Sequence, residues 1–293
     1  RTRLDNLVFF SYVNSSYETT SLPHYYDLLF EVEEKRTGQF LIGAGFSSID
    51  NLIAFVELGQ GNFDILGWPR FTGAGQKMKV RLQLGTERRD VTISFVEPWF
   101  LNRKLKLGVD IFQNESEYYS DDYDQRNTGA SVSLTKPMSS FDRLIGSYSL
   151  QQIRVYNVDE DASDDIKKEE GSSLQSQVSV AWLHDSRDNY FVPTTGSRIK
   201  PMVSLSGGPL GADVDMYKVE VRASKYIPLW LNHNLEMRGW FASVNSYGSS
   251  DEVRIFDRLY LGGGQSLRGY KYREIGPVDA EEEPLGGQTA WFT

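Results

Sequence analysis

The chain has 293 residues, a formal net charge of −9 and no cysteine. The missing cysteines exclude a disulfide framework and a thiolate metal site, and the acidic balance argues against a nucleic-acid-binding protein. The mean hydropathy is −0.42. No apolar run approaches the roughly 20 residues that a membrane-spanning helix needs. A chain this polar can cross a bilayer only as a closed barrel of alternating strands.

The first 36 residues differ in sequence pattern from the rest of the chain. Residues 4–7 have the character of a helix end, and residues 8–13 predict a short strand. Residues 25–34 predict a second strand, because Leu28, Phe30 and Val32 recur at every second position. We interpret this segment as the last part of a small α/β domain.

From Gln39 onward, apolar and polar residues alternate with a period of two, and turns interrupt the pattern at intervals. The clearest segment is 77–84, where one face carries Met78, Val80, Leu82 and Leu84 and the other carries Lys77, Lys79, Arg81 and Gln83. Roughly eleven such segments lie between Gln39 and Gly248, and a twelfth begins near Gly286. The sequence therefore predicts an antiparallel all-β fold.

Strands with one polar face suit either a soluble sandwich or a wide membrane barrel. A sandwich turns its polar face outward, whereas a barrel turns it toward a water-filled lumen. Segments such as 103–115 and 213–229 are longer than the usual strands of about 5–6 residues in soluble proteins. Their length favours tilted strands that cross a membrane and extend beyond it.

The connections differ between the two ends of the strands. Prolines lie at or near the end of every second strand, at positions 69, 98, 137, 193 and 228. The longer polar connections are 118–125, 158–173 and 246–284. Short turns on one side and long loops on the other are typical of outer-membrane barrels. Aromatic residues flank the short turns, as in an interfacial girdle, although a soluble sandwich can also place aromatics near strand ends.

The most specific segment is Ser266–Tyr270, which reads Ser-Leu-Arg-Gly-Tyr. It resembles the sixth external loop of BamA-type outer-membrane barrel-assembly proteins, which carry periplasmic POTRA domains before a transmembrane barrel. Other segments resemble this family in the same order along the chain: 33–48, 59–63, 95–100, 185–198 and 285–287. The resemblance covers essentially the whole chain.

The resemblance implies a transmembrane antiparallel β-barrel in which about 12 of an expected 16 strands are present. It also implies a division of the chain into two parts. Residues 1–36 are expected to be the C-terminal part of the last α/β POTRA domain. Residues 37–293 are expected to be the barrel, ending at about its twelfth strand.

The resemblance implies a lumenal role for the loop motif Leu267, Arg268, Gly269 and Tyr270. In the family this loop folds back into the barrel, and its arginine pairs with carboxylates on the inner wall. A guanidinium inside a barrel needs such a bidentate acidic partner. The expected partners fall mostly beyond Thr293. The alternative is an ordinary glycine-rich hairpin with a solvated arginine.

The predicted first barrel strand contributes the residues of a lateral gate, Gln39, Leu41, Gly43, Gly45 and Phe46. Glycine weakens a strand and its pairing, and a weakly paired edge offers free N–H and C=O groups to an added strand. The family mechanism uses such a seam to pair with a client strand. Alternatively the glycines fit the curvature of the barrel, and both interpretations can hold.

A periplasmic turn motif is expected at Asp185, Arg187, Asp188, Pro193 and Gly196, with Arg187 and Asp188 in local hydrogen bonds. His184 and Ser186 adjoin it, but adjacency along an extended strand does not bring a Ser-His-Asp site together. The acidic run 159–165 fits no calcium loop, which indicates a solvated external loop. We therefore expect no enzyme activity, no metal and no cofactor.

These observations predict the core subunit of an outer-membrane barrel-assembly machinery, which folds and inserts barrel precursors through a seam involving the first strand. The expected partners are unfolded outer-membrane protein precursors, accessory assembly lipoproteins and outer-membrane lipids, with no nucleic acid. The expected location is the bacterial outer membrane, with the POTRA part in the periplasm. The alternatives are a TamA-like protein or two-partner-secretion pore of the same superfamily and, less favoured, a barrel enzyme such as a lipase.

Overall fold

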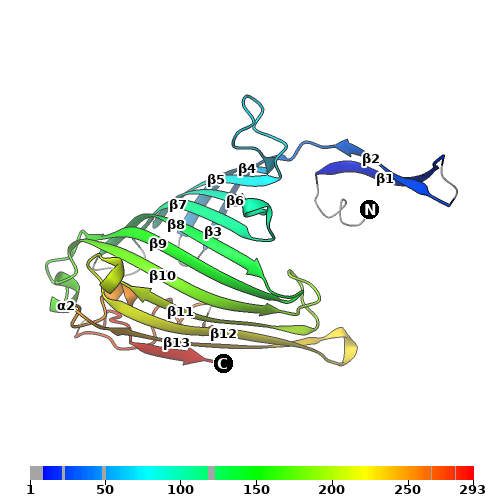
Figure 1. Cartoon of the computed structure of the whole chain (residues 1–293). Helices are drawn as coiled ribbons and strands as arrows, with labels where there is room; N and C mark the ends of the chain where they lie inside the picture. Colours follow the sequence, from blue (N-terminus) through cyan, green and yellow to red (C-terminus); the bar gives the residue numbers. More distant parts are fainter. Residues whose placement is uncertain (1–8, 22–23, 48–50, 118–122, 265, 281) are drawn as a thin grey trace.

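The computed structural model describes residues 9–21, 24–47, 51–117, 123–264, 266–280 and 282–293. These residues form two antiparallel sheets. One is a hairpin of two strands, and the other is a single meander of twelve strands in which each strand pairs with its neighbours in the sequence. Figure 1 shows the large sheet curling into a curved wall, with the hairpin projecting from one end.

The hairpin consists of β1 (Phe10–Thr19) and β2 (Tyr26–Glu34). The large sheet comprises β3 (Gly38–Ser47), β4 (Asn51–Phe63), β5 (Gln76–Gly85), β6 (Arg88–Glu97), β7 (Lys106–Ser116), β8 (Asp124–Pro137), β9 (Asp142–Tyr156), β10 (Gly171–Asp185), β11 (Gly196–Ser206), β12 (Met216–Pro228), β13 (Asn234–Ser246) and β14 (Thr289–Phe292). A short helix, α2 (Asp164–Lys167), and 3-10 turns at Phe100–Asn102, Gly208–Leu210, Trp230–Asn232 and Ile255–Asp257 lie in the connections. None of the helices in the described ranges is long and apolar enough to span a membrane.

The twelve-stranded sheet confirms the predicted all-β fold and the predicted strands. Eleven strands lie between Gly38 and Ser246, and the twelfth is Thr289–Phe292. Closure into a barrel is not seen. Within the described residues, β3 pairs only with β4, and β14 pairs only with β13.

The large sheet is polar on its covered face and apolar on its exposed face. On β5, Gln83 is 9% exposed, whereas Leu82 and Leu84 beside it are 45% and 64% exposed. The same inversion recurs on β12, where Glu220 is buried and Tyr217 is exposed. A soluble sandwich would show the opposite pattern, because it buries its apolar face to gain hydrophobic free energy. This burial pattern favours the barrel interpretation of the alternation.

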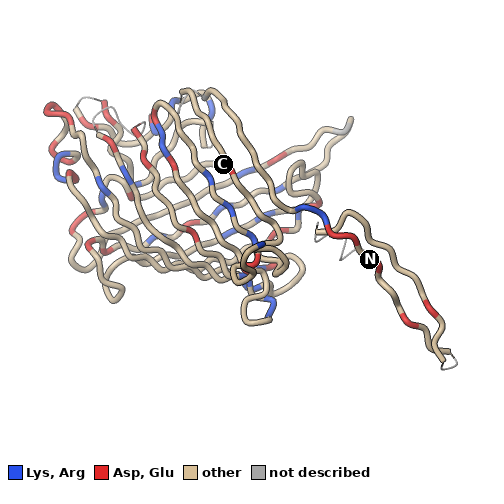
Figure 2. Tube along the Cα trace, turned by 90° about the horizontal axis from the view of Figure 1, so that it is seen from above, with Lys and Arg blue, Asp and Glu red and all other residues tan. Residues whose placement is uncertain are grey.

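The two ends of the sheet differ, as the sequence indicated. One end, which we call the loop end, carries the connections 157–170, 207–215 and 247–288. The opposite end, the turn end, carries the connections at or beside the prolines at positions 69, 98, 137, 193 and 228. The predicted contrast in length is incomplete. The turn-end connection 64–75 is long, and the loop-end connection 86–87 is a tight turn. Figure 2 shows acidic residues gathered at the loop end.

The α/β part expected for residues 1–36 is not evident in the described residues. They form only the β1–β2 hairpin, and β1 runs on to Thr19, well past the strand predicted at 8–13. The extension follows from register, because Asn14 to Thr19 pair continuously with Glu31 to Tyr26. The helix end expected at residues 4–7 lies outside the described residues.

The longest connection, 247–288, folds against the concave face of the sheet. Two small apolar clusters hold it there. One joins Val253 and Leu259 of this loop to Ala242 and Val244 of β13. The other joins Ile255 to residues of two other loop-end connections and of β9: Tyr123, Val155, Ala162 and Ile166. The largest buried apolar groups thus serve to dock a loop inside the curved wall.

Candidate functional site

The turn between β10 and β11 is organised by Asp188. Its carboxylate accepts hydrogen bonds from the backbone N–H groups of Thr194 (2.9 Å) and Thr195 (3.1 Å) and from the Thr194 hydroxyl (2.5 Å). These bonds, the Thr194 side-chain bond first, hold the pKa of Asp188 well below its ordinary value. The expected local hydrogen bonds of this turn are present.

Arg187 closes the other side of the same turn. Its Nε and Nη2 donate to the two carboxylate oxygens of Asp185, both at 2.8 Å, in a bidentate pair. The side chains of Asp185 and Arg187 are only 5% and 14% exposed. Pro193 is half-buried in the same turn, and Gly196 begins β11 with a φ of +99°. All five predicted turn residues therefore lie in or beside one compact turn.

Replacing Arg187 with alanine is expected to destabilise the protein by about 2 kcal/mol, because it leaves the largely buried Asp185 carboxylate without its bidentate partner. Denaturant unfolding followed by tryptophan fluorescence measures the loss. The control is Lys168→Ala, which removes the exposed ion pair with Asp165 and should change stability by no more than about 0.5 kcal/mol. Equal midpoints for the two variants would contradict the structural role of the pair.

The loop motif forms a closed turn of its own. The Ser266 hydroxyl donates to the Gly262 carbonyl (2.9 Å) and accepts from the Gly262 N–H (2.8 Å), and the Gly263 N–H donates to the Tyr270 carbonyl (3.1 Å). Leu267 is half-buried, and Arg268, Gly269 and Tyr270 are exposed. This turn holds the motif at the tip of the loop and presents the Arg268 side chain outward from it.

The buried cation of this loop is Arg273, which is 6% exposed. Its guanidinium lies 3.4 Å from the centre of the Tyr260 ring, and its Nη1 donates to the Tyr123 hydroxyl at 3.3 Å. Tyr260 in turn donates to the Ile255 carbonyl at 2.8 Å. A desolvated cation–π contact of this kind is worth about 2 kcal/mol. Arg273 therefore ties the loop to the neighbouring connection at the loop end.

Polar contacts dock the start of the loop onto β10. The Gln175 side-chain amide of β10 donates to both carboxylate oxygens of Asp257 at 3.1 Å. Arg254 forms an ion pair with Glu169 at 3.6 Å and also donates to the Ser173 hydroxyl. The docked loop is therefore held by ionisable groups as well as by the apolar clusters.

The docking is expected to depend on pH. Burial of the carboxyl group raises the pKa of Asp257 to about 6, while other atoms of this residue stay partly exposed. Burial also raises the pKa of Glu169. A carboxyl whose pKa is higher in the docked state binds a proton more tightly there, so docking strengthens as pH falls from 7 through about 6 and levels off near 4. Hydrogen exchange of residues 247–264 between pH 5 and pH 8 measures this. Asp257→Asn should remove much of the pH dependence of docking. The same pH dependence in this variant and in the wild type would contradict the role of Asp257.

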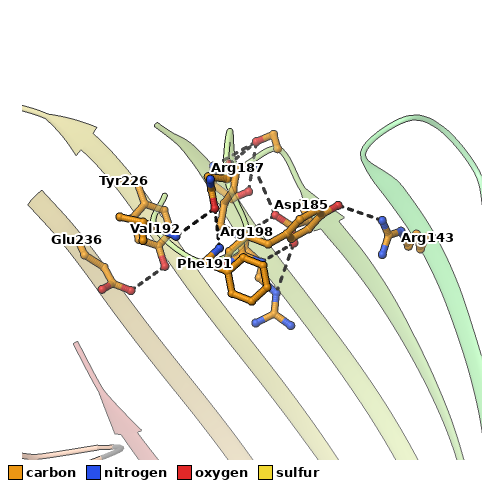
Figure 3. A network of polar contacts seen from close by, with 12 residues as sticks. Arg143, Asp185, Arg187, Phe191, Val192, Arg198, Tyr226 and Glu236 are labelled. Atoms are coloured by element: carbon orange, nitrogen blue, oxygen red, sulfur yellow. Dashed lines mark hydrogen bonds and ion pairs between the residues drawn. The ribbon is translucent and has the colours of Figure 1, made fainter. Parts of the chain in front are cut away.

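Polar side chains of β12 and β13 meet at the turn end of these strands. The Tyr226 hydroxyl donates to the Glu236 carboxylate at 2.8 Å, and Arg238 donates to the same carboxylate at 2.8 Å. Arg187 interacts electrostatically with Tyr226, and Arg268 with Glu236. Figure 3 shows this row of polar groups running from the β10–β11 turn across to β13. The charge of Arg268 thus acts on Glu236 at long range.

The predicted gate residues lie elsewhere, on the edge strand β3. Leu41 is 49% and Phe46 79% exposed, and Gln39 is also exposed. Gly43 faces Phe55 of β4, whose ring would lie 2.6 Å from an added Cβ, whereas a Cβ at Gly45 would meet nothing within 4 Å. An aromatic ring packed over a strand glycine compensates for the missing side chain and helps to fix the register at Gly43. At Gly45 the space is open.

The side chains beside the turn motif do not form a hydrolytic site. His184 hydrogen-bonds to Asp142 (2.9 Å), while the Ser186 hydroxyl bonds to Ser197. No group of three or more metal-ligating side chains is found in the part of the chain that the structure describes. The contacts of this serine and histidine are therefore those of strand pairing.

Sequence reasoning missed Arg273, Glu236 and Asp257. Arg273 follows the recognised motif by three residues, and nothing in its flanks distinguishes a buried arginine from a solvated one. Glu236 lies on a strand whose inner face was expected to be polar, so its face was predictable but its partner was not. The signal for Asp257 was weaker still, because it lies in a connection without periodicity.

Comparison with known proteins places these features in context. The family model of the Omp85 superfamily domain matches residues 70–293. The outer membrane protein assembly factor BamA of Nitratidesulfovibrio vulgaris is 30% identical over 291 residues, which are 99% of this chain and 35% of that protein. The sorting and assembly machinery component 50 homolog of Mus musculus is 26% identical over 283 residues, 95% of this chain and 57% of that protein. The chain thus spans 35% and 57% of the lengths of these relatives.

Solved structures agree on the fold. The crystal structure of BamA from Haemophilus ducreyi lacking POTRA domains 1-3 superposes with a TM-score of 0.80 at 23% identity and covers 99% of this chain and 58% of that one. CdiB from Acinetobacter baumannii superposes with a TM-score of 0.51 at 15% identity, covering 92% and 50%. The twelve-stranded wall therefore has the fold of the corresponding part of the BamA barrel.

Proposed function

Because the chain belongs to the Omp85 superfamily, we propose that it is the barrel part of a BamA-like core subunit that folds and inserts β-barrel precursors into the bacterial outer membrane. The superfamily and the BamA relative also confirm that the protein is not an enzyme. Bacterial location rests on the higher identity to BamA, since mitochondrial-type relatives also match.

The observation that carries the proposal is the reversed polarity of the twelve-stranded wall, whose exposed face is apolar and whose covered face is polar. Its exposed apolar face suits lipid, and its polar face suits a wet lumen. The edge strand β3 pairs on one side only within the described residues, and Gly45 leaves open space beside it. A precursor strand could add to this edge through backbone hydrogen bonds.

We extend the proposal to the parts around the wall. Residues 1–36 would be the end of a POTRA domain in the periplasm, which agrees with the β1–β2 hairpin lying at the turn end (Figure 1). Accessory lipoproteins would bind from the same side. The remaining barrel strands would close the wall beside β3, so that the seam lies between the first and last strands.

Cysteine crosslinking tests the seam. The chain has no native cysteine, so introduced thiols are the only ones in it. Gly45→Cys on β3, with a cysteine in the last strand of a barrel precursor, should give a disulfide-linked adduct in cells. The matched control is Gly146→Cys on β9, which also has nothing within 4 Å of an added Cβ but lies on a strand paired on both sides.

Adducts at Gly45 without adducts at Gly146 would support assembly through the seam. Equal adducts at both positions, or none at Gly45 with a folded protein, would overturn it. The alternative, a TamA-like protein or two-partner-secretion pore, predicts that a transported passenger crosslinks to lumenal positions while barrel precursors do not crosslink to Gly45.

A further inference from the structure

A pocket of about 340 Å³ lies at the turn end of the wall, between the β6–β7 connection and the β8–β9 hairpin. Three cationic residues line it, Lys104, Lys106 and Arg143. Trp99 and Pro137 supply an apolar wall, and Thr135 supplies a hydroxyl group. No carboxylate is among the lining residues.

Strand register explains why these cations converge. Lys106 of β7 lies directly opposite Thr135 of β8, and Pro137 of β8 lies opposite Arg143 of β9. Thr135 and Pro137 are two residues apart and so share a face of the sheet. Lys104 lies in the β6–β7 connection, two residues before Lys106, and lines the same pocket. The side chains therefore project from three adjacent strands toward one point on the concave face.

The β6–β7 connection fixes the remaining wall. Its chain turns sharply at Leu101 and Asn102, which both have a φ of +55°. The Phe100 N–H donates to the Leu105 carbonyl at 2.9 Å, which closes the connection beneath Trp99. Trp99 is thereby held at the pocket rim with its side chain 56% exposed.

The nearby acids are engaged elsewhere. Asp142, adjacent to Arg143, points to the opposite face of β9 and bonds to His184 and Ser139. Glu97 accepts a bond from the Trp99 N–H (2.9 Å) and another from Gln76 (3.0 Å). The Arg143 guanidinium donates a hydrogen bond to the Tyr190 hydroxyl at 3.3 Å (Figure 3).

Two other cations on the concave face of the wall have acidic partners. Arg81 pairs with Glu57 at 3.3 Å, and Arg222 pairs with Glu220. Like charges brought together without a counter-charge repel one another, at a cost that rises as water is excluded. In this pocket three positive groups converge with no carboxylate among the lining residues, so an anion would complete the charge balance.

We propose that this pocket binds a phosphate group, carried either by a phospholipid headgroup or by free phosphate. Lysine ammonium and arginine guanidinium groups form short charge-assisted hydrogen bonds to phosphate oxygens. The Thr135 hydroxyl adds a neutral donor. Trp99 and Pro137 offer an apolar surface beside the charges, which suits the glycerol and first methylene groups of a lipid.

The test compares two variants of the purified protein in uncharged detergent at fixed ionic strength. The pocket variant is Lys104→Gln/Lys106→Gln/Arg143→Gln. Inorganic phosphate is titrated calorimetrically, and retention of phosphatidylglycerol against phosphatidylcholine is measured by native mass spectrometry from mixed-lipid nanodiscs. Wild type should bind phosphate or retain phosphatidylglycerol, and the pocket variant should bind at least tenfold more weakly.

The control variant removes the same charge elsewhere on the concave face, through Lys77→Gln/Lys79→Gln/Lys200→Gln. It should bind as the wild type does. Retention of phosphatidylglycerol with no phosphate binding identifies a lipid site, and phosphate binding alone identifies a site for the free ion. An equal loss in both variants overturns the proposal, because the effect would then be the general field of the wall, and so does the absence of binding in the wild type.

Discussion

Gly196→Ala is expected to destabilise the protein by about 3 kcal/mol or more, the largest effect of any single methyl group in the β10–β11 turn. Gly196 has a φ of +99°, where an L-residue is strained. An added Cβ would also overlap the backbone carbonyl of Ser186, and that backbone is fixed because the Ser186 N–H donates to the Ser197 carbonyl at 2.9 Å. Neither the strain nor the overlap can be relieved by a side-chain rotation.

Gly146→Ala on β9 is the matched control. It has ordinary strand backbone and nothing within 4 Å of an added Cβ, so alanine there should leave stability unchanged or raise it by up to about 1 kcal/mol. Urea unfolding in detergent micelles, followed by tryptophan fluorescence, compares the two. A Gly196→Ala midpoint equal to that of Gly146→Ala would show that the turn can form with another backbone path.

The wall of the structure was predictable because its signal is local. Alternation at 77–84 assigns a face to every side chain, and the structure agrees, with Gln83 buried and Leu84 exposed. The structure adds the strand order, in which each strand of the meander pairs with its neighbours in the sequence. Period two identifies a face but does not say which face meets water. Strand length and turn chemistry were needed for that step.

The turn was also within reach of sequence reasoning. Asp188 bonds to the chain six and seven residues later, and Arg187 bonds to Asp185 two residues before it. Such contacts are short in sequence and follow from turn chemistry. The proline and glycine positions of the motif agree with this geometry.

The interior of the wall was not predictable in the same way. Arg273 meets Tyr123 across 150 residues, and Gln175 meets Asp257 across 82. No periodic pattern reports such pairs, because they depend on how an irregular loop packs into a cavity shaped by twelve strands. The same limit applies to the phosphate pocket. Its cations come from separate connections and strands, and only register brings them together.

Arg273→Ala is expected to release the 247–288 loop from the wall. The change removes a guanidinium that is 6% exposed and lies over the Tyr260 ring, and it leaves a cavity next to Tyr123. The hydrogen bond to Tyr123 and the packing beside it are docking contacts, whereas the cation–π contact with Tyr260 stabilises the fold of the loop itself. Their loss together costs the docked loop about 3 kcal/mol. Hydrogen exchange measures the release directly. Residues 255–264 and 266–280 should exchange faster in the variant, whereas the exchange rates in β9 and β10 should stay unchanged.

Arg268→Ala separates the role of Arg268 from that of Arg273 in this loop. Arg268 is exposed and interacts with the Glu236 carboxylate at long range, so its loss should leave docking within about 0.5 kcal/mol of wild type. If Arg268 serves barrel assembly, Arg268→Ala should still lower assembly of a precursor in reconstituted vesicles. The opposite result, in which Arg268→Ala frees the loop and Arg273→Ala does not, would transfer the anchoring role to the motif itself.

The contrast gives each arginine a separate task. An anchor must lose its water to gain its contacts, which is why Arg273 is buried among aromatic rings. A group that engages a partner must keep its charge accessible, as Arg268 does at the loop tip. The loop can then hold its position at the loop end through Arg273 while Arg268, in the motif turn, stays exposed and acts on the Glu236 carboxylate only at long range.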